Sequence, residues 1–162
     1  MYFKITKPFF ILFLSLFFQL YAHAQSKKKI IKNNIKSTSV TITENGTTYC
    51  ESKTVFDSKG NEKEITHYQK NGTIISVHKL KYNTNGDEIE DAEYNGDNGL
   101  IENKFTTYNV NHKKVEEVFY DETNKLIKKH TYTYDTKGLK TEKKTYNESG
   151  KIISVKKYTY TF

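Results

Sequence analysis

Hydrophobic and polar positions alternate along most of this chain in short blocks, and each block ends in one aromatic or aliphatic residue followed by a polar cluster. We call these ending residues the anchors. They are spaced alternately 14 and 12 residues apart, which defines a repeat of 26 residues. A fixed period of this kind is typical of architectures that stack one supersecondary unit. The anchors are Ile42, Phe56, Tyr68, Tyr82, Tyr94, Tyr108, Tyr120, Tyr134, Tyr146 and Tyr160.

The residues after each anchor predict a tight hairpin turn. Asn or Asp follows the anchor directly in seven of nine cases, and Gly stands four residues after it in six. An Asx side chain accepts hydrogen bonds from the turn backbone, and glycine fits a position with positive φ. Together they predict a type I turn closed by a G1 bulge. Asn98, His112 and Asn124 replace the glycine elsewhere, and both residue types tolerate positive φ.

The segments between the turns are rich in Ile, Val, Thr and Tyr and contain no proline, as in "TIISVHKLKY" and "KIISVKKYTY". They predict an all-β fold, an antiparallel meander of about ten strands, with a cap hairpin over 37–55 and repeats over 56–81, 82–107, 108–133 and 134–160. We expect an open or curled sheet, and the alternative is a closed up-and-down barrel. Because all the spacings are even, the anchors are expected to share one face.

The first 24 residues have the pattern of a secretory signal peptide. Lys4 and Lys7 precede the apolar run "FFILFLSLFF", and "AHA" ends at Ala24. The pattern predicts cleavage near Ala24 and a protein that is secreted, periplasmic or at the cell surface, with no membrane insertion after cleavage. Residues 25–36 are basic and unpatterned, and we expect them to form a flexible lead-in.

Composition narrows the classes of function. The single cysteine, Cys50, excludes an intramolecular disulfide. The net charge is +7, but the lysines alternate with acidic residues and no arginine is present, so we expect no binding to nucleic acid. The histidines lack the spacing of metal ligands, and no phosphate-binding or nucleophile motif appears. We therefore predict no catalytic residues, no metal, no cofactor and no enzymatic activity.

The segments "YDTKGLKTEKKTY" and "YDETNKLIKKHTY" resemble the YD repeats of the RHS family, and the whole pattern is similar to short repeat proteins secreted by Bacteroidetes. The resemblance covers Ile42 to Phe162 and implies strand-turn-strand units at the cell surface. The spacing is tighter than in RHS repeats and the chain is too short for their enclosing shell. Encapsulation is therefore not implied.

These observations lead to two functional hypotheses. The first is a binding module for a protein or glycan, in which exposed tyrosines give a large contact area at low entropic cost. The second is an inhibitor or immunity-like protein that pairs an edge strand with its client. The same edge could form a homodimer. The candidate binding residues are Tyr82, Tyr108, Tyr132, Tyr134, Tyr158 and Tyr160.

Overall fold

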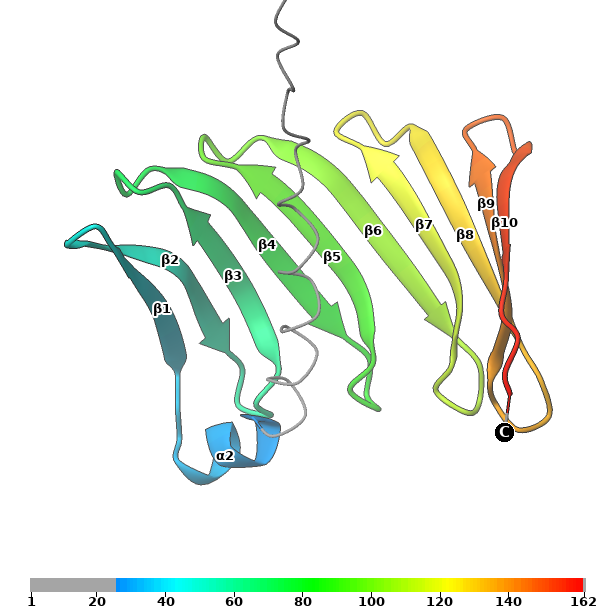
Figure 1. Cartoon of the computed structure of the whole chain (residues 1–162), viewed down its shortest axis with the longest axis horizontal. Helices are drawn as coiled ribbons and strands as arrows, with labels where there is room; N and C mark the ends of the chain where they lie inside the picture. The colour runs from blue at the N-terminus through cyan, green and yellow to red at the C-terminus, as the bar shows by residue number, and fades with distance from the viewer. Residues whose placement is uncertain (1–25, 162) are drawn as a thin grey trace, which may run out of the picture.

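The computed structural model describes residues 26–161, which form ten strands in one antiparallel sheet and a short helix beside it (Figure 1). The strands follow each other in chain order, so the predicted meander is confirmed. Within the described residues β1 and β10 are the two edges and the sheet does not close, which excludes the barrel. The elements are α2 (Ser26–Lys32), β1 (Ser37–Glu44), β2 (Thr47–Phe56), β3 (Glu62–Tyr68), β4 (Ile74–Tyr82), β5 (Glu88–Asn95), β6 (Leu100–Tyr108), β7 (Lys114–Asp121), β8 (Leu126–Tyr134), β9 (Lys140–Asn147) and β10 (Ile152–Lys157).

The predicted turn chemistry is present in all seven Asx turns. In each one the side-chain Oδ1 accepts hydrogen bonds from the backbone N–H groups two and four residues later, as Asn83 does from Asn85 and Asp87, both at 2.9 Å. The other six turns begin at Asp57, Asn95, Asn109, Asp121, Asp135 and Asn147. The expected positive φ is also confirmed where glycine is replaced, at 62° for Asn98, 57° for His112 and 64° for Asn124.

A second irregularity follows each of these turns and changes the face on which the anchors lie. Tyr82 pairs with Glu88 but Lys81 pairs with Glu90, so Ile89 is an extra residue in β5. One extra residue transfers every later side chain to the opposite face. The expectation that all anchors share one face is therefore wrong, and successive anchors alternate between faces. The equivalent extra residues are Lys63, Ile75, Ile101, Val115, Ile127, Thr141 and Ile153.

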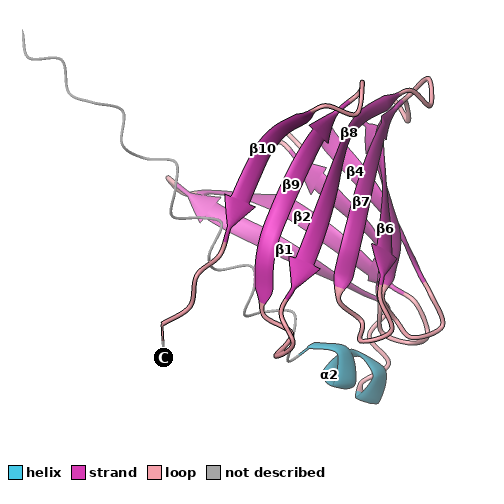
Figure 2. Cartoon of the chain, turned by 90° about the vertical axis from the view of Figure 1, so that its right-hand side faces the viewer, coloured by secondary structure: helices cyan, strands magenta, loops and turns pink. Residues whose placement is uncertain are grey.

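The sheet has two faces of different chemistry, which the strand pairing defines. The ladder face carries Tyr82, Tyr108 and Tyr134 together with most of the paired charges. The aliphatic face carries Tyr68, Tyr94, Tyr120 and Tyr146 together with Ile74, Val77, Leu100, Phe105, Val118 and Leu126. Figure 2 shows that the sheet is curved, with β7 to β10 in front of β1 and β2. In this single layer, the large apolar side chains that are buried among the described residues are few, namely Ile30, Phe119 and Tyr132.

Helix α2 occupies the segment for which a flexible lead-in is expected, and that expectation is not met. Ile30 is buried at 5% exposure, and the Lys27 Nζ donates a hydrogen bond to Asn61 Oδ1 at 2.6 Å. Gly60 has φ of +72°, and a Cβ there would lie 3.0 Å from the Ile31 side chain. The helix is therefore fixed by contact with the turn before β3. It is too short to cross a membrane, and no helix within residues 26–161 could. The predicted signal peptide lies outside the described residues.

Candidate binding site

Three of the predicted binding tyrosines use their hydroxyl groups within the sheet. Each donates to a backbone carbonyl of the neighbouring strand, directly before the extra residue of a bulge, where the regular pairing is interrupted. Burial, with the charge of Glu88 adding to it, raises the pKa of Tyr108 to about 12. The hydroxyls of this ladder are thus structural. The bonds run from Tyr108 to Glu88 at 2.8 Å, from Tyr134 to Lys114 at 2.7 Å and from Tyr160 to Lys140 at 2.9 Å.

The ladder face of β4 to β6 holds a network in which the opposite charges are paired. Asp91 accepts from His78 Nδ1 at 2.9 Å and from Lys104 Nζ at 3.2 Å, and the same Nζ lies 2.9 Å from Glu88 Oε1. Burial would raise the pKa of Asp91, but the hydrogen bond from His78 and the charge of Lys104 hold it below its ordinary value. We call these four residues the paired network.

Glu117 forms the next step along the same face. It is 8% exposed, it lies 2.5 Å from Lys114 Nζ, and it accepts a hydrogen bond from the Tyr132 hydroxyl. Burial opposes its ionisation, but the hydrogen bonds from Lys114 and Tyr132 keep its pKa below the ordinary value. Burial and this carboxylate together raise the pKa of Tyr132. The Tyr132 hydroxyl is therefore already bonded to Glu117, and the Tyr132 ring is left as a surface on which other side chains can pack.

Two lysines of β9 lie over tyrosine rings of β8 and of the segment after β10, and a third lysine lies beside them on β10. Lys140 Nζ lies 4.7 Å from the centre of the Tyr132 ring and 5.7 Å from that of Tyr158, and Lys143 Nζ lies 5.5 Å from Tyr132. Lys143 is the direct cross-strand partner of Lys156. Burial lowers the pKa of Lys143; the charge of Glu117 opposes this shift, and the charges of Lys156 and Lys140 add to it. We call these five residues the lysine–tyrosine cluster.

The cluster lacks the carboxylates that complete the paired network. Among residues 26–161 no Asp or Glu lies within ion-pair distance of Lys140, Lys143 or Lys156, whereas Lys114 and Lys128 on the same face are paired with Glu117 and Glu102. The charge is concentrated around one ring rather than dispersed. An anion placed here would relieve the repulsion between like charges that face each other across a strand pair.

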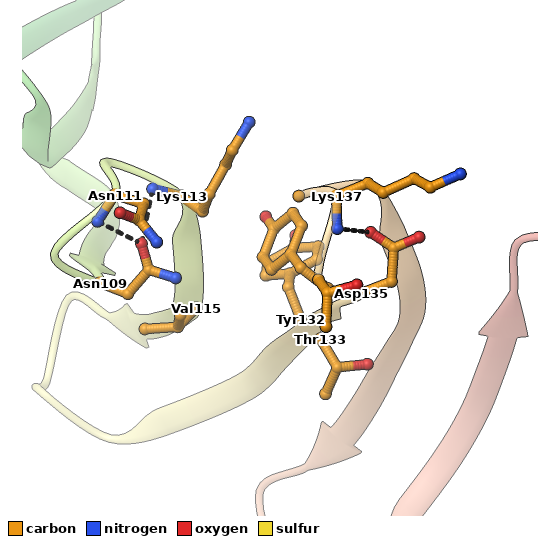
Figure 3. A pocket seen from close by; sticks show the side chains of 11 residues that line it. Asn109, Asn111, Lys113, Val115, Tyr132, Thr133, Asp135 and Lys137 are labelled. Atoms are coloured by element: carbon orange, nitrogen blue, oxygen red, sulfur yellow. Dashed lines mark hydrogen bonds between the residues drawn. The ribbon is translucent and has the colours of Figure 1, made fainter.

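An open hollow of about 580 Å³ adjoins the cluster, between the turn that precedes β7 and the turn that precedes β9. Tyr132 and Tyr134 line it together with Asn109 and Asn111. Figure 3 shows Tyr132 between the two turns, with Lys113 extending from one turn and Lys137 from the other. The hollow and the cluster share Tyr132, and together they form the candidate binding site.

The predicted site residues separate into two groups. Four of them come together around Lys140. Tyr132 and Tyr158 contact its Nζ through their rings, Tyr160 donates to its carbonyl, and Tyr134 is its cross-strand partner. The other two, Tyr82 and Tyr108, end β4 and β6 beside the paired network.

The lysines of the site are not among the residues that the sequence pattern predicts. Lys140, Lys143 and Lys156 are recognised only once the pairing places them on one face. A usable signal was the absence of Asp and Glu from β10.

Comparisons with known proteins give only distant structural similarity. No family model and no curated protein matches the sequence. The chain is similar to a protein with unknown function (BF3112) from Bacteroides fragilis, at a TM-score of 0.43 and 15% identity over 78% of this chain and 96% of that one. It is also similar to TarM, at a TM-score of 0.32 and 19% identity over 84% of this chain and 25% of TarM. A mutant of S. aureus TarM in complex with Fondaparinux, alpha-GlcNAc-glycerol and UDP gives a TM-score of 0.32 and 22% identity over 83% of this chain and 25% of that chain. The chain thus spans about a quarter of TarM, and none of these likenesses assigns a function.

Proposed function

We propose that this chain is a non-enzymatic binding module, secreted or displayed at the cell surface, that binds a protein or glycan partner through the lysine–tyrosine cluster. The observation that carries the proposal is the convergence of Lys140 and Lys143 on the Tyr132 ring, with Lys156 facing Lys143 and no carboxylate of the described residues within ion-pair distance of any of the three. The YD-like repeat and the signal-peptide pattern of residues 1–24 support the extracellular location.

Comparison of equivalent positions in the repeats indicates that the fold does not require the cluster. Positions 26 residues apart occupy the same place in the sheet, and the place of Lys143 is taken by Asp91 two repeats earlier. Likewise Lys156 corresponds to Lys104, and the two pairs, Asp91 with Lys104 and Lys143 with Lys156, are equivalent cross-strand pairs. The same backbone thus accepts an ion pair, which is more favourable than two like charges. A ligand is the simplest reason for retaining lysine.

The test is a binding screen of the secreted chain against immobilised surface polysaccharides and surface proteins, using two variants with the same loss of charge. The site variant combines Lys140→Gln, Lys143→Gln and Lys156→Gln. The control combines Lys53→Gln, Lys59→Gln and Lys63→Gln, which are exposed lysines on β2, β3 and their turn. We expect the site variant to lose binding and the control to keep it. Equal binding by the site variant and the wild type would contradict the proposal.

A second candidate function, pairing of the edge strand with a client, rests on the exposure of β10. All six of its residues are exposed, and Ile152, Ile153 and Val155 are exposed by 46%, 60% and 45%. Its first four residues repeat the Ile-Ile-Ser-Val of β4, which has β5 as a neighbour. An exposed apolar edge strand is a template for another strand.

Strand pairing at the β10 edge can be tested with a peptide that has the sequence of the next strand in the repeat. A peptide with the β5 sequence, Glu88–Asn95, should protect the β10 amides from hydrogen exchange if the edge binds clients. Val155→Pro removes a backbone donor at the edge and should abolish the protection. Light scattering of the chain alone reports whether a second copy occupies the edge instead. Absence of protection at millimolar peptide would remove this candidate.

A further inference from the structure

The cations of the candidate site are arranged as a strip rather than as a point. Lys143 and Lys156 face each other on β9 and β10. Lys140 lies at the start of β9, and its Nζ and that of Lys143 both lie over the Tyr132 ring. Lys113 and Lys137 add two cations on the turns beside the hollow, which shares Tyr132 with the cluster (Figure 3). A strip of cations matches a polymer with repeated negative charges better than it matches one small anion.

Accessible aromatic rings lie inside this strip. Tyr132 is only 8% exposed and forms the base, but Tyr158 is 38% and Tyr160 is 43% exposed. Lys140 lies between Tyr132 and Tyr158, so a group resting on the Tyr158 ring would have an amine at its edge. Aromatic faces pack against the C–H faces of sugar rings, while ammonium groups bind carboxylate or sulfate. A ligand that alternates rings and negative charges meets both conditions.

The backbone of this face disfavours the rival macromolecule, an acidic peptide. An extended peptide brings N–H and C=O groups that need partners, and it usually finds them at a sheet edge. The backbone of β9 is already paired on both sides, with β8 and with β10. A peptide lying across this face would find cations but no backbone partners. A polysaccharide has no such requirement.

We propose that the candidate site binds an acidic polysaccharide, whose carboxylate or sulfate groups lie among Lys140, Lys143 and Lys156 and whose sugar ring packs on Tyr158. The proposal rests on the binding function proposed above and specifies its ligand class. It also assigns the residues separate roles, because the lysines recognise charge and the tyrosine recognises the ring. The hydroxyl ladder and the Glu117–Tyr132 contact hold the base of the site and do not take part in recognition.

The experiment titrates the secreted chain with three soluble probes of matched length. Oligogalacturonate carries both rings and carboxylates, its methyl ester carries rings without charge, and poly-L-glutamate carries carboxylates without rings. We expect binding to oligogalacturonate, and affinity weaker by about tenfold or more for each of the other two.

The Lys140, Lys143 and Lys156 triple variant should lose oligogalacturonate binding, and the Lys53, Lys59 and Lys63 control should retain it. Tyr158→Ala should weaken binding of oligogalacturonate and leave poly-L-glutamate binding unchanged. Thermal unfolding of each variant shows that it is folded.

The other outcomes separate this inference from the function on which it rests. Equal affinity for poly-L-glutamate and oligogalacturonate would show recognition of charge or an acidic peptide, and would overturn the saccharide assignment. Binding of the methyl ester as tight as that of the acid would overturn the role of the lysines. Failure of all three probes would also overturn the inference, while the proposed binding function would stand if the triple variant still lost a partner from the surface screen. If no partner in that screen depended on the three lysines, the proposed function itself would fall.

Discussion

The paired network and the lysine–tyrosine cluster occupy the same three places in the repeat and have opposite chemistry. In the network the three places carry two carboxylates and one lysine, with the lysine within 3.2 Å of both carboxylates. In the cluster all three carry lysine, and two of these are direct cross-strand partners. The corresponding residues are Glu88 and Lys140, Asp91 and Lys143, and Lys104 and Lys156.

The repeat therefore determines the backbone and leaves the chemistry of the ladder face open. Turns, bulges and tyrosine hydroxyl bonds recur in the repeats of both regions. The intermediate repeat places Lys114, Glu117 and His130 in the same three positions, so the face changes stepwise from acidic to basic along the chain. Positions that the fold does not constrain are those where a binding function can be located. We therefore expect substitutions to affect stability at one end and binding at the other.

The largest effect is expected from Lys104→Met. The change leaves Asp91 and Glu88 without their shared cation, and the Asp91 side chain is only 20% exposed. Loss of the cation from two partly buried carboxylates is costly, even though Asp91 keeps the hydrogen bond from His78, so the free energy of unfolding should fall by about 2 kcal/mol, measured by urea denaturation. The matched change Lys156→Met removes a like charge and should leave stability unchanged or slightly higher. A comparable loss in both variants would refute the contrast between the two regions.

A smaller loss is expected from Glu117→Gln, between the two regions. The amide keeps the shape but loses the charge that Lys114 contacts at 2.5 Å, and it accepts the Tyr132 hydroxyl bond more weakly. We expect the free energy of unfolding to fall by about 1–2 kcal/mol. Because Glu117 also helps to hold the Tyr132 ring beneath Lys140 and Lys143, the tyrosine fluorescence should change as well. Glu148→Gln, in an exposed turn, is the control and should show neither effect.

Much of the fold follows from short-range chemistry that the sequence displays. The turn positions of Asn98, His112 and Asn124 are predictable because only a few residue types adopt positive φ at low cost. The position of the bulge after each turn, by contrast, is not predictable from the local sequence. The extra residue is β-branched in seven of the eight bulges, as in Ile75 and Ile89, but such residues also suit a regular strand. The register therefore depends on pairing, which local pattern does not specify.

The candidate site was only partly predictable for the same reason. The tyrosines could be selected by their periodicity, but the lysines could be grouped only when the bulges had been located. Burial is also set by neighbours, since the identical Ile-Ile-Ser-Val leaves Ser76 7% exposed in β4 and Ser154 exposed at the edge. Helix α2 is held by contact with the turn before β3, where Lys27 bonds Asn61 and Ile31 lies against Gly60, a tertiary contact that its lysine-rich sequence does not indicate.

A single substitution can convert the cluster toward the paired network. Lys143→Asp recreates at β9 and β10 the pair that Asp91 and Lys104 make, because Asp would face Lys156. The unfolding free energy should rise by about 0.5–1 kcal/mol, while binding to the anionic probe is lost. A gain in stability with a loss of binding is the behaviour of a residue kept for function. Lys53→Asp, on an exposed position of β2, should change neither quantity. A Lys143→Asp protein that is less stable would mean that the lysines already have a favourable arrangement.

The smallest effect is a pH dependence that belongs to the paired network. The hydrogen bond to Asp91 outweighs burial and raises the pKa of His78 above its ordinary value, with the charges of Asp91 and Glu93 adding to it and Lys104 opposing it. A histidine with a raised pKa in the folded state stabilises the protein fully below the pKa of the unfolded state, and this stability is lost as pH rises through the folded value.

The measurement compares urea unfolding of the wild type and His78→Asn between about pH 5 and pH 8. Stability of the wild type relative to the variant should decline across the upper half of that range. His130 should change stability with pH in the opposite direction. Burial and the charge of Lys143 lower its pKa, so its protonation on acidification destabilises the folded state. His130→Asn should therefore remove a loss of stability at the acidic end. If both variants shifted the pH dependence in the same direction, the two histidines would share one environment, and the division of the ladder face into a paired and an unpaired region would be wrong.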